Sequence, residues 1–358
     1  MNVSPDFLYE ILGGVVAVEG ILVLLGVLVI LGHGFWLRRE RERSKRLLAT
    51  AHTRLASLLE EEAPRTGCEQ FEHFPVRLQF RLLADILPSL SGARRQRLTR
   101  LATDLGLLSL SLKQCRSRWW WRRLRGARFC TSLGYGHSLI LTLLTDPHHI
   151  VRSQAAEWAS QYPTPLLIKQ LLELLHDEEI LCHYAAQDAL LRMGNAVIEP
   201  LADYLSSHSQ QAYLEPALTV ALGLAAPEFL PAALSLSGHQ SLNVRVRAVS
   251  LLGALGGNDV VNVLTERLDD HEQEVRTEAA RALGALGHWP AASRLAAALR
   301  DPAWIVRRES ALSLRALGAP GLLFLRRALC DKDEFAADMA RQALDLPETT
   351  ATFLPSAS

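Results

Sequence analysis

The side chains that could carry chemistry do not form a recognisable catalytic or metal-binding pattern. His148 and His149 are adjacent, so in a helix their rings would point about 100° apart, whereas zinc requires three or four convergent ligands. The five cysteines include no C-x-x-C pair, and the 358-residue chain has no glycine-rich phosphate loop, G-x-S-x-G or H-E-x-x-H motif. The sequence therefore predicts a protein that is not an enzyme and that uses no metal, cofactor or small-molecule substrate.

A run of tryptophans and arginines, RWWWRRLRGAR over residues 118–128, is a candidate contact surface. Three consecutive helical residues spread over about 200°, so at least one of the three indoles is expected to be exposed. The run could pack between repeats with solvated arginines, could contact anionic lipid headgroups or a membrane partner, or, as the least favoured interpretation, could stack nucleic-acid bases. The candidate contact residues are Trp119, Trp120, Trp121, Arg122 and Arg123.

Residues 11–32 form an apolar segment that contains one charged side chain, Glu19. At 1.5 Å per residue the segment reaches roughly 33 Å, enough to cross a hydrocarbon core of about 30 Å. No Lys or Arg precedes it and several follow directly, so the positive-inside rule places residues 1–10 outside and the bulk of the chain in the cytoplasm. The sequence thus predicts an uncleaved, single-pass transmembrane helix in the inner (plasma) membrane. An acid at this depth is either protonated or paired with a partner helix, which makes Glu19 a further candidate contact.

The formal charge of the chain is zero, but it is unevenly distributed. Residues 1–36 carry −3, residues 37–135 carry +12 and residues 136–358 carry −9. The basic part is expected to begin with a juxtamembrane helix over 37–62 and to continue with degenerate helical pairs over 75–135. A net charge of zero argues against a general nucleic-acid binder, whereas a basic segment beside a membrane span suits anionic headgroups.

The remainder of the chain is an internal repeat. Three stretches align without gaps at an interval of 31 residues: NVRVRAVSLLGALG (243–256), EVRTEAARALGALG (274–287) and IVRRESALSLRALG (305–318). The valine before the arginine in each stretch (Val244, Val275 and Val306) defines a position that we call the valine slot. At the same 31-residue interval toward the N-terminus, this slot holds Tyr213, Cys182 and Val151. Each unit predicts two helices that bury their apolar faces only when neighbouring units stack. The predicted fold is therefore an all-α solenoid over residues 136–346, preceded by the transmembrane helix and followed by a disordered tail over 347–358.

These repeats resemble the HEAT family, and in particular the short HEAT-like repeats of phycobilin lyases with the pattern D-x-x-x-x-V-R-x-x-A-A-x-A-L-G. The resemblance implies a ladder of hydrogen bonds, in which an aspartate before each second helix meets an arginine that follows the valine. The implied ladder residues are Asp146, Arg152, Asp177, Arg245, Asp270, Arg276, Asp301 and Arg307.

The implied ladder is interrupted in the middle of the solenoid. Histidines occupy two aspartate slots, and the arginine slots hold His183 and Leu214. The unit 195–225 also has Pro216 in its second helix and Ala225 in place of the closing glycine. We therefore expect a change of curvature or a softer joint at this unit.

The functional hypothesis combines the span with the solenoid. It is a membrane-anchored HEAT-repeat scaffold or adaptor at the cytoplasmic face, which binds a protein partner that is itself membrane-embedded. Similarity to bacterial single-pass HEAT proteins suggests an accessory subunit of envelope or exopolysaccharide glycosyltransferase machinery. The alternatives are a bilin lyase-like enzyme and a nucleic-acid-binding HEAT-like protein.

Overall fold

A computed structural model describes residues 31, 33, 35, 39, 42, 45–56 and 71–347. The chain divides into two compact units, residues 1–110 and 111–358. Within the described residues all regular structure is helical and no strand occurs. The predicted all-α class is confirmed.

The described part of the first unit contains short amphipathic helices. Residues 45–56 are helical, and α3 (Val76–Ile86), the 3-10 turn η1 (Leu87–Ser89) and α4 (Gly92–Asp104) follow. Pro75 directly precedes α3, where its fixed φ (−56°) and missing N–H cost the helix nothing. The helix α5 (Leu107–Cys115) contains the division between the two units.

The transmembrane prediction is not supported by the structure. Of the predicted span 11–32 only Leu31 is described, and Glu19 lies outside the described residues. In the part of the chain that is described, no helix is both long and apolar enough to cross a membrane. The longest helices from α3 onward have 14 residues, which reach about 21 Å against the roughly 30 Å that a bilayer core requires. The single-pass inner-membrane location predicted from the sequence is corrected on this finding.

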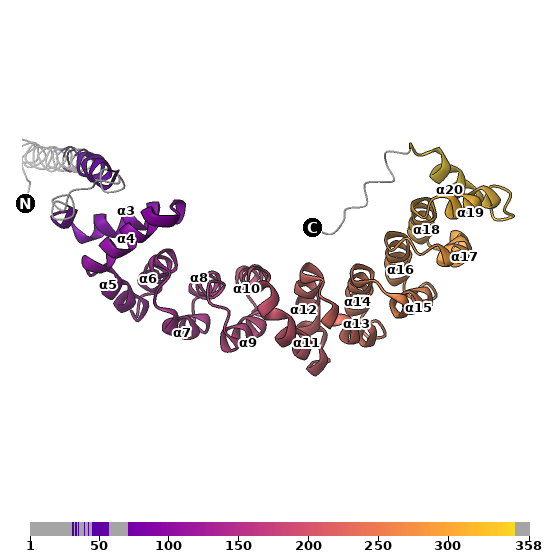
Figure 1. Cartoon of the computed structure of the whole chain (residues 1–358), viewed down its shortest axis with the longest axis horizontal. Helices are drawn as coiled ribbons and strands as arrows, with labels where there is room; N and C mark the ends of the chain where they lie inside the picture. Colours follow the sequence, from indigo (N-terminus) through magenta and orange to yellow (C-terminus); the bar gives the residue numbers. More distant parts are fainter. Residues whose placement is uncertain are drawn as a thin grey trace, which may run out of the picture. The chain divides into compact units, whose positions relative to one another are not determined.

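The second unit is a row of helix pairs arranged in two layers (Figure 1). The first helices of the pairs lie in one layer; they are α7 (Ile140–Leu144), α9 (Pro165–Leu174), α11 (Ile198–Ser207), α13 (Leu230–Leu236), α15 (Asn258–Arg267), α17 (Ala292–Ala297) and α19 (Ala319–Ala328). The second helices lie in the other layer; they are α6 (Trp120–Leu133), α8 (His149–Ala159), α10 (Ile180–Met193), α12 (Gln211–Leu224), α14 (Leu242–Leu255), α16 (Gln273–Ala285), α18 (Trp304–Ala316) and α20 (Glu334–Asp345). The row of this unit curves so that the second helices line its concave side. The predicted solenoid is confirmed.

The core of the second unit is built from the repeated apolar slots. The valine slot is fully buried at Val151, Cys182, Val244, Val275 and Val306. Small residues allow neighbouring second helices to approach closely: a Cβ placed on Gly253 would lie 2.7 Å from the Cβ of Ala282. Since each helix pair buries its apolar face against the next pair, the stack as a whole supplies the core.

The second helices of the regular units end at a glycine in the left-handed region. Gly256, Gly287 and Gly318 have φ of 70°, 66° and 69°, a conformation that costs a residue with a Cβ about 1–2 kcal/mol. Ala225 occupies the same slot with φ of 46° and is the one described non-glycine residue with positive φ. The middle unit thus keeps a positive φ at this slot without the residue that favours it, although its ψ of 42° differs from the −171° of Gly256 and the −142° of Gly318.

Candidate functional site

A ladder of arginine–aspartate pairs links neighbouring repeats. Arg152 Nη2 lies 2.7 Å from Asp177 Oδ1, and Arg276 Nε lies 2.7 Å from Asp301 Oδ2. The next pair, Arg245 Nε and Asp270 Oδ2, is 3.2 Å apart, and its side chains are only 5 % and 4 % exposed. Each of these pairs joins one arginine to one aspartate, and both side chains are nearly buried. If one partner is lost, the charge of the other stays nearly buried without that partner.

Each ladder group also satisfies backbone groups in its own repeat. Arg152 Nη1 donates to the carbonyls of Asp146 and Pro147, and Asp177 accepts from the N–H of Glu179 at the start of α10. Burial alone would raise the pKa of the Asp177 carboxyl, but the hydrogen bonds from Arg152 and from the Glu179 N–H outweigh burial and lower it. The ladder therefore fixes the turn between the two helices of a unit as well as the stacking of units.

The ladder differs from the prediction at its two ends. Arg123 pairs with Asp146 (Nε to Oδ2, 2.5 Å) and adds a rung upstream. Arg307 donates to the carbonyls of Asp301 and Pro302 and lies over the Phe335 ring (5.0 Å to its centroid), and it pairs with no carboxylate among the described residues. Asp331 is paired with Arg300 (2.7 Å). Arg123, a predicted contact residue, is thus a ladder residue, and the predicted rung of Arg307 is absent.

Between Asp177 and Arg245 the ladder is interrupted, as the slots implied. His183, in an arginine slot, donates from Nδ1 to the Leu175 carbonyl and accepts at Nε2 from Gln187 (3.0 Å). His208, in an aspartate slot, donates to the Tyr204 carbonyl (2.8 Å) and stacks on the Tyr204 ring at 4.0 Å between centroids. These histidines satisfy their own units and form no rung between units.

The interruption also changes the core. Tyr213, in the valine slot, is only half-buried; its ring stacks on His208 (5.2 Å between centroids) and meets His176 at a tilt (4.4 Å, 59°). Leu214, in the arginine slot, is fully buried. In the same place α10 and α12 pack less extensively than the second helices on either side of them do. The expected softer joint therefore corresponds to a looser helix contact.

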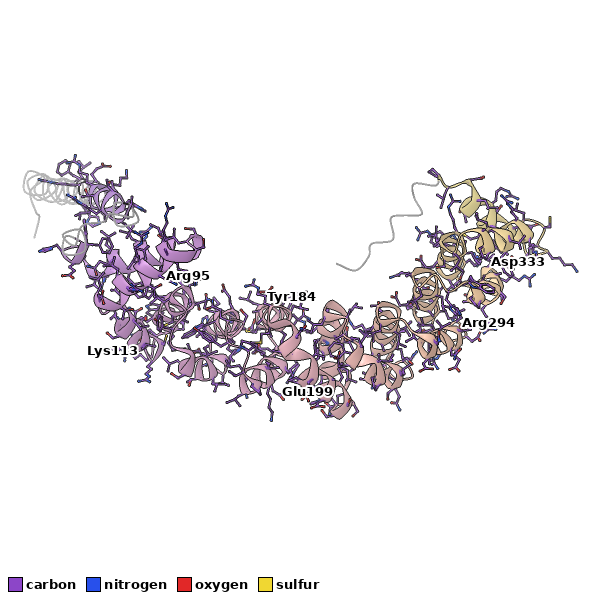
Figure 2. The ribbon with its side chains drawn as sticks, in the orientation of Figure 1. Arg95, Lys113, Tyr184, Glu199, Arg294 and Asp333 are labelled. Carbon is purple, nitrogen blue, oxygen red and sulfur yellow. The ribbon has the colours of Figure 1, made fainter. Side chains whose placement is uncertain are left out.

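A groove of about 500 Å³ lies at this looser contact. Its polar lining comes from the three second helices α10, α12 and α14: His183, Tyr184, Gln187, Glu215, Thr219 and Arg247. Tyr184 is 62 % exposed and projects from the concave side, whereas Glu199 of α11 lies on the opposite side of the row (Figure 2). The groove is thus open to a partner that approaches the concave face.

The carboxylate in the groove is held in its ionised form. Glu215 accepts from Gln211 (3.3 Å), from Asn243 (3.4 Å) and from Arg247 Nη2 (3.3 Å). Burial raises the pKa of Glu215, but these three hydrogen bonds more than offset it, and the pKa is lowered. Arg247 also donates to the Thr219 hydroxyl (2.7 Å), which connects α12 to α14.

The tryptophan run lies at the beginning of α6. Trp119 and Trp121 are 39 % and 43 % exposed, and Trp120 is partly buried and stacks on His148 with centroids 4.0 Å apart. At least one exposed indole was expected from the helix geometry, and two are found. Arg122 is exposed.

The repeats match a known family. The family model for HEAT repeats matches residues 198–284 and 268–345. Residues 198–345 are therefore similar to HEAT repeats. The groove lies at the boundary between this matched region and the repeats that precede it, with Tyr184 on one side and Glu215 on the other.

Solved structures with similar helix arrangements include an engineered protein (17 % identity, 82 % of this chain and 98 % of that chain, TM-score 0.38). Human deoxyhypusine hydroxylase in complex with glycerol matches at 23 % identity over 67 % of this chain and 95 % of its own, with a TM-score of 0.29. A complex of Kap95 with Nup1 matches at 13 % identity over 85 % of this chain, with a TM-score of 0.49; this chain spans 50 % of that protein. At these scores the structures give no information on activity or partner. No curated protein sequence matches the chain.

The groove is the feature that the sequence did not predict. Two features of the sequence could have indicated it: histidine and tyrosine are frequent in two adjoining units, and the arginine slots of these units hold His183 and Leu214 instead of arginine. Of these histidines and tyrosines, His176, His183 and Tyr184 line the groove, and Tyr213 contacts His176. In the described residues no group of histidine, cysteine and acidic side chains is arranged to hold a metal ion.

Proposed function

We propose that this chain is a non-enzymatic scaffold that binds a protein partner in the groove between α10 and α12. The observation that carries the proposal is the coincidence of three features at one place: the break in the ladder, the looser helix contact and the groove on the concave face. Repeat solenoids generally use such extended concave surfaces for binding.

The composition of the groove suits a protein interface. The exposed Tyr184 stands at its rim, and Ile180 and Leu181 of the same helix are 71 % and 50 % exposed. Interfaces concentrate binding energy in aromatic and arginine side chains with an apolar surround. Arg247 and Glu215 add a fixed pair of opposite charges that orients polar groups of a partner.

The charge of this part of the chain favours a basic partner segment. Residues 157–247 contain ten Asp or Glu and four Lys or Arg, one of which, Arg247, lines the groove and is paired with Glu215. Complementary potentials increase the association rate and exclude partners of like charge. A segment with lysine or arginine side chains is therefore the proposed occupant.

The accessory role in envelope glycosyltransferase machinery depended on the membrane span. No observation on the described residues supports it, and the proposal is restricted to a scaffold with a protein partner.

Photocrosslinking tests the proposal on the full-length chain. A photoreactive phenylalanine analogue replaces Tyr184 in the groove, and the matched control replaces Glu199 on the opposite face. We expect irradiation in cells to produce a discrete protein adduct from position 184 and not from position 199. Adding Glu215→Lys, which leaves two positive charges in the groove, should remove that adduct. The absence of any adduct at 184, or identical adducts from both positions, would contradict the proposal.

A further inference from the structure

The tryptophans at the start of α6 form a compact stack that is partly open to solvent. The rings of Trp119 and Trp121 lie 4.6 Å apart at 29°, and Trp120 meets Trp121 edge-on at 6.1 Å. On the other side Trp120 stacks on His148, which stacks on His149 at 4.9 Å. The stack therefore holds two exposed indoles in a fixed orientation against α8.

The surroundings of this stack are positively charged without compensation. Residues 111–145 contain seven Lys or Arg and no Asp or Glu. Of these seven, Arg123 is neutralised by Asp146, and Arg128 donates to the Gln154 amide. Three exposed arginines remain beside the indoles: Arg118 in the bend before α6, and Arg122 and Arg125 within α6.

The ring faces of the indoles are largely occupied by the protein itself. Trp119 has Trp121 on it and the Arg118 guanidinium 4.7 Å from its ring centroid. Trp120 is covered by His148. Nucleic-acid bases bind tryptophan through its open ring faces, and the faces of these two indoles are already in use.

The exposed arginines beside these indoles are hydrogen-bond donors. Indole N–H and guanidinium groups donate and do not accept, and the edge of an aromatic ring is electropositive. Carboxylates are the complementary acceptors, since they accept from arginine in bidentate fashion. Side chains of an acidic segment, spaced along a helix or strand, match arginines spaced along α6.

We propose that Trp119, Trp121, Arg118, Arg122 and Arg125 form a second docking surface, which binds an acidic segment of a protein partner. The surface is called the α6 surface below. It shares no residue with the groove between α10 and α12, so it stands or falls independently of the proposed function. Its charge is opposite to that of residues 157–247, so the two sites select different segments.

Fluorescence anisotropy with the full-length chain tests the α6 surface. The probe is a fluorescein-labelled peptide of alternating glutamate and leucine, and its control is the same peptide with glutamine in place of glutamate. We expect the glutamate peptide to bind, the glutamine peptide to bind at least about tenfold more weakly, and added salt to weaken the first.

Charge reversal assigns the binding to particular arginines. Arg122→Glu with Arg125→Glu should weaken binding of the glutamate peptide by about tenfold or more. The matched control is Arg326→Glu with Arg327→Glu, which changes the net charge equally on two exposed arginines of α19. Trp121→Ala should also weaken binding. Unchanged thermal melting of each variant shows that the fold is intact.

Three results would overturn the proposal. In the first, the glutamate peptide does not bind the wild-type chain; in the second, the control pair on α19 weakens binding as much as the α6 pair does. In the third, oligothymidylate binds more tightly than the peptide and loses its affinity with the α6 pair, which would make the surface a nucleic-acid site.

Discussion

The repeat slots have different roles in two regions of the molecule. One region is the regular repeats around α14, α16 and α18, and the other is the interrupted region around α10 and α12. In the regular repeats the slots hold buried valines and reciprocal rungs such as Arg245–Asp270 and Arg276–Asp301. In the interrupted region the equivalent slots hold Tyr213 and histidines that bond within their own units. The regular slots therefore stabilise the stack, and the interrupted slots leave polar and aromatic groups at a groove.

This difference indicates where a repeat protein can place a binding site. Neighbouring repeats supply the stability that one unit gives up, because stability in a solenoid is approximately a sum of unit and interface terms. Residues that break a local rule are expected at functional sites. Each of the five predictions below changes residues in the regular repeats, in the interrupted region, or in both.

The largest expected effect is the removal of a rung from the regular repeats. Arg245→Ala leaves Asp270 without its nearly buried partner and should lower the free energy of unfolding by about 3 kcal/mol. Urea denaturation measures the change. The control is Arg192→Ala, which breaks an exposed pair with Asp188 and should cost at most about 0.5 kcal/mol. Equal effects for the two variants would show that burial of the rung is unimportant.

The second prediction compares close helix contacts. A Cβ on Gly284 would lie 2.5 Å from the Ser313 Cβ, so Gly284→Ala should destabilise by about 1–2 kcal/mol in spite of its better helix propensity. In the interrupted region a Cβ on Gly223 meets only the end of the Leu191 side chain, which is 40 % exposed and can move. Gly223→Ala should therefore be neutral or slightly stabilising. Thermal unfolding of both variants checks the contrast, which fails if Gly223→Ala is the more harmful change.

The third prediction restores a rung in the interrupted region. His183→Arg with His208→Asp supplies the residues that pair in the regular units, and it should raise stability by about 1 kcal/mol. If the groove exists because the rung is missing, the same variant should also reduce crosslinking from position 184. A midpoint of unfolding that does not rise would mean that the missing ladder is not what loosens the joint.

The fourth prediction concerns the turn after α12. Ala225→Gly removes the cost of a left-handed alanine and should stabilise the chain by about 0.5 kcal/mol after the greater flexibility of glycine in the unfolded chain is counted. The reverse change at the equivalent regular position, Gly256→Ala, should destabilise it. Two changes of the same sign would contradict the cost assigned to a residue with a Cβ at a positive φ.

The smallest expected effect is on pH dependence. The pKa of Asp177 is lowered in the folded chain, so its pairing contributes stability that is fully present above the ordinary pKa of 3.8 and is lost as the pH falls through the lowered folded value. Asp177→Asn should be less stable than the wild type near neutral pH, and the difference should shrink below about pH 4. Denaturation at a series of pH values measures it; a difference that grows on acidification would reverse the assigned sign.

Much of the fold could be predicted because the repeat is a local property of the sequence. The 31-residue interval located the second helices, the buried valines and the closing turns. The rungs Arg152–Asp177, Arg245–Asp270 and Arg276–Asp301 followed from residue types in fixed slots. The missing rungs in the middle were predicted from the same slots.

Other features could not be predicted from slots alone. Arg123 reaches Asp146 although 23 positions separate them, whereas the regular rungs span 25. Asp331 pairs with Arg300, whereas Arg307 lies over the Phe335 ring and pairs with no described carboxylate. Which carboxylate an arginine reaches depends on distances in space.

The sequence by itself determined the helical class, the stacking of units and the positions where the ladder stops, because each depends on periodicity within and between neighbouring repeats. Only the tertiary structure decided that α10 and α12 separate into a groove and that Trp119 and Trp121 share a stack beside exposed arginines. Both depend on how far adjacent helices approach one another and on which side-chain faces they cover. That balance of packing is set by all the contacts of neighbouring units together, so no single repeat encodes it.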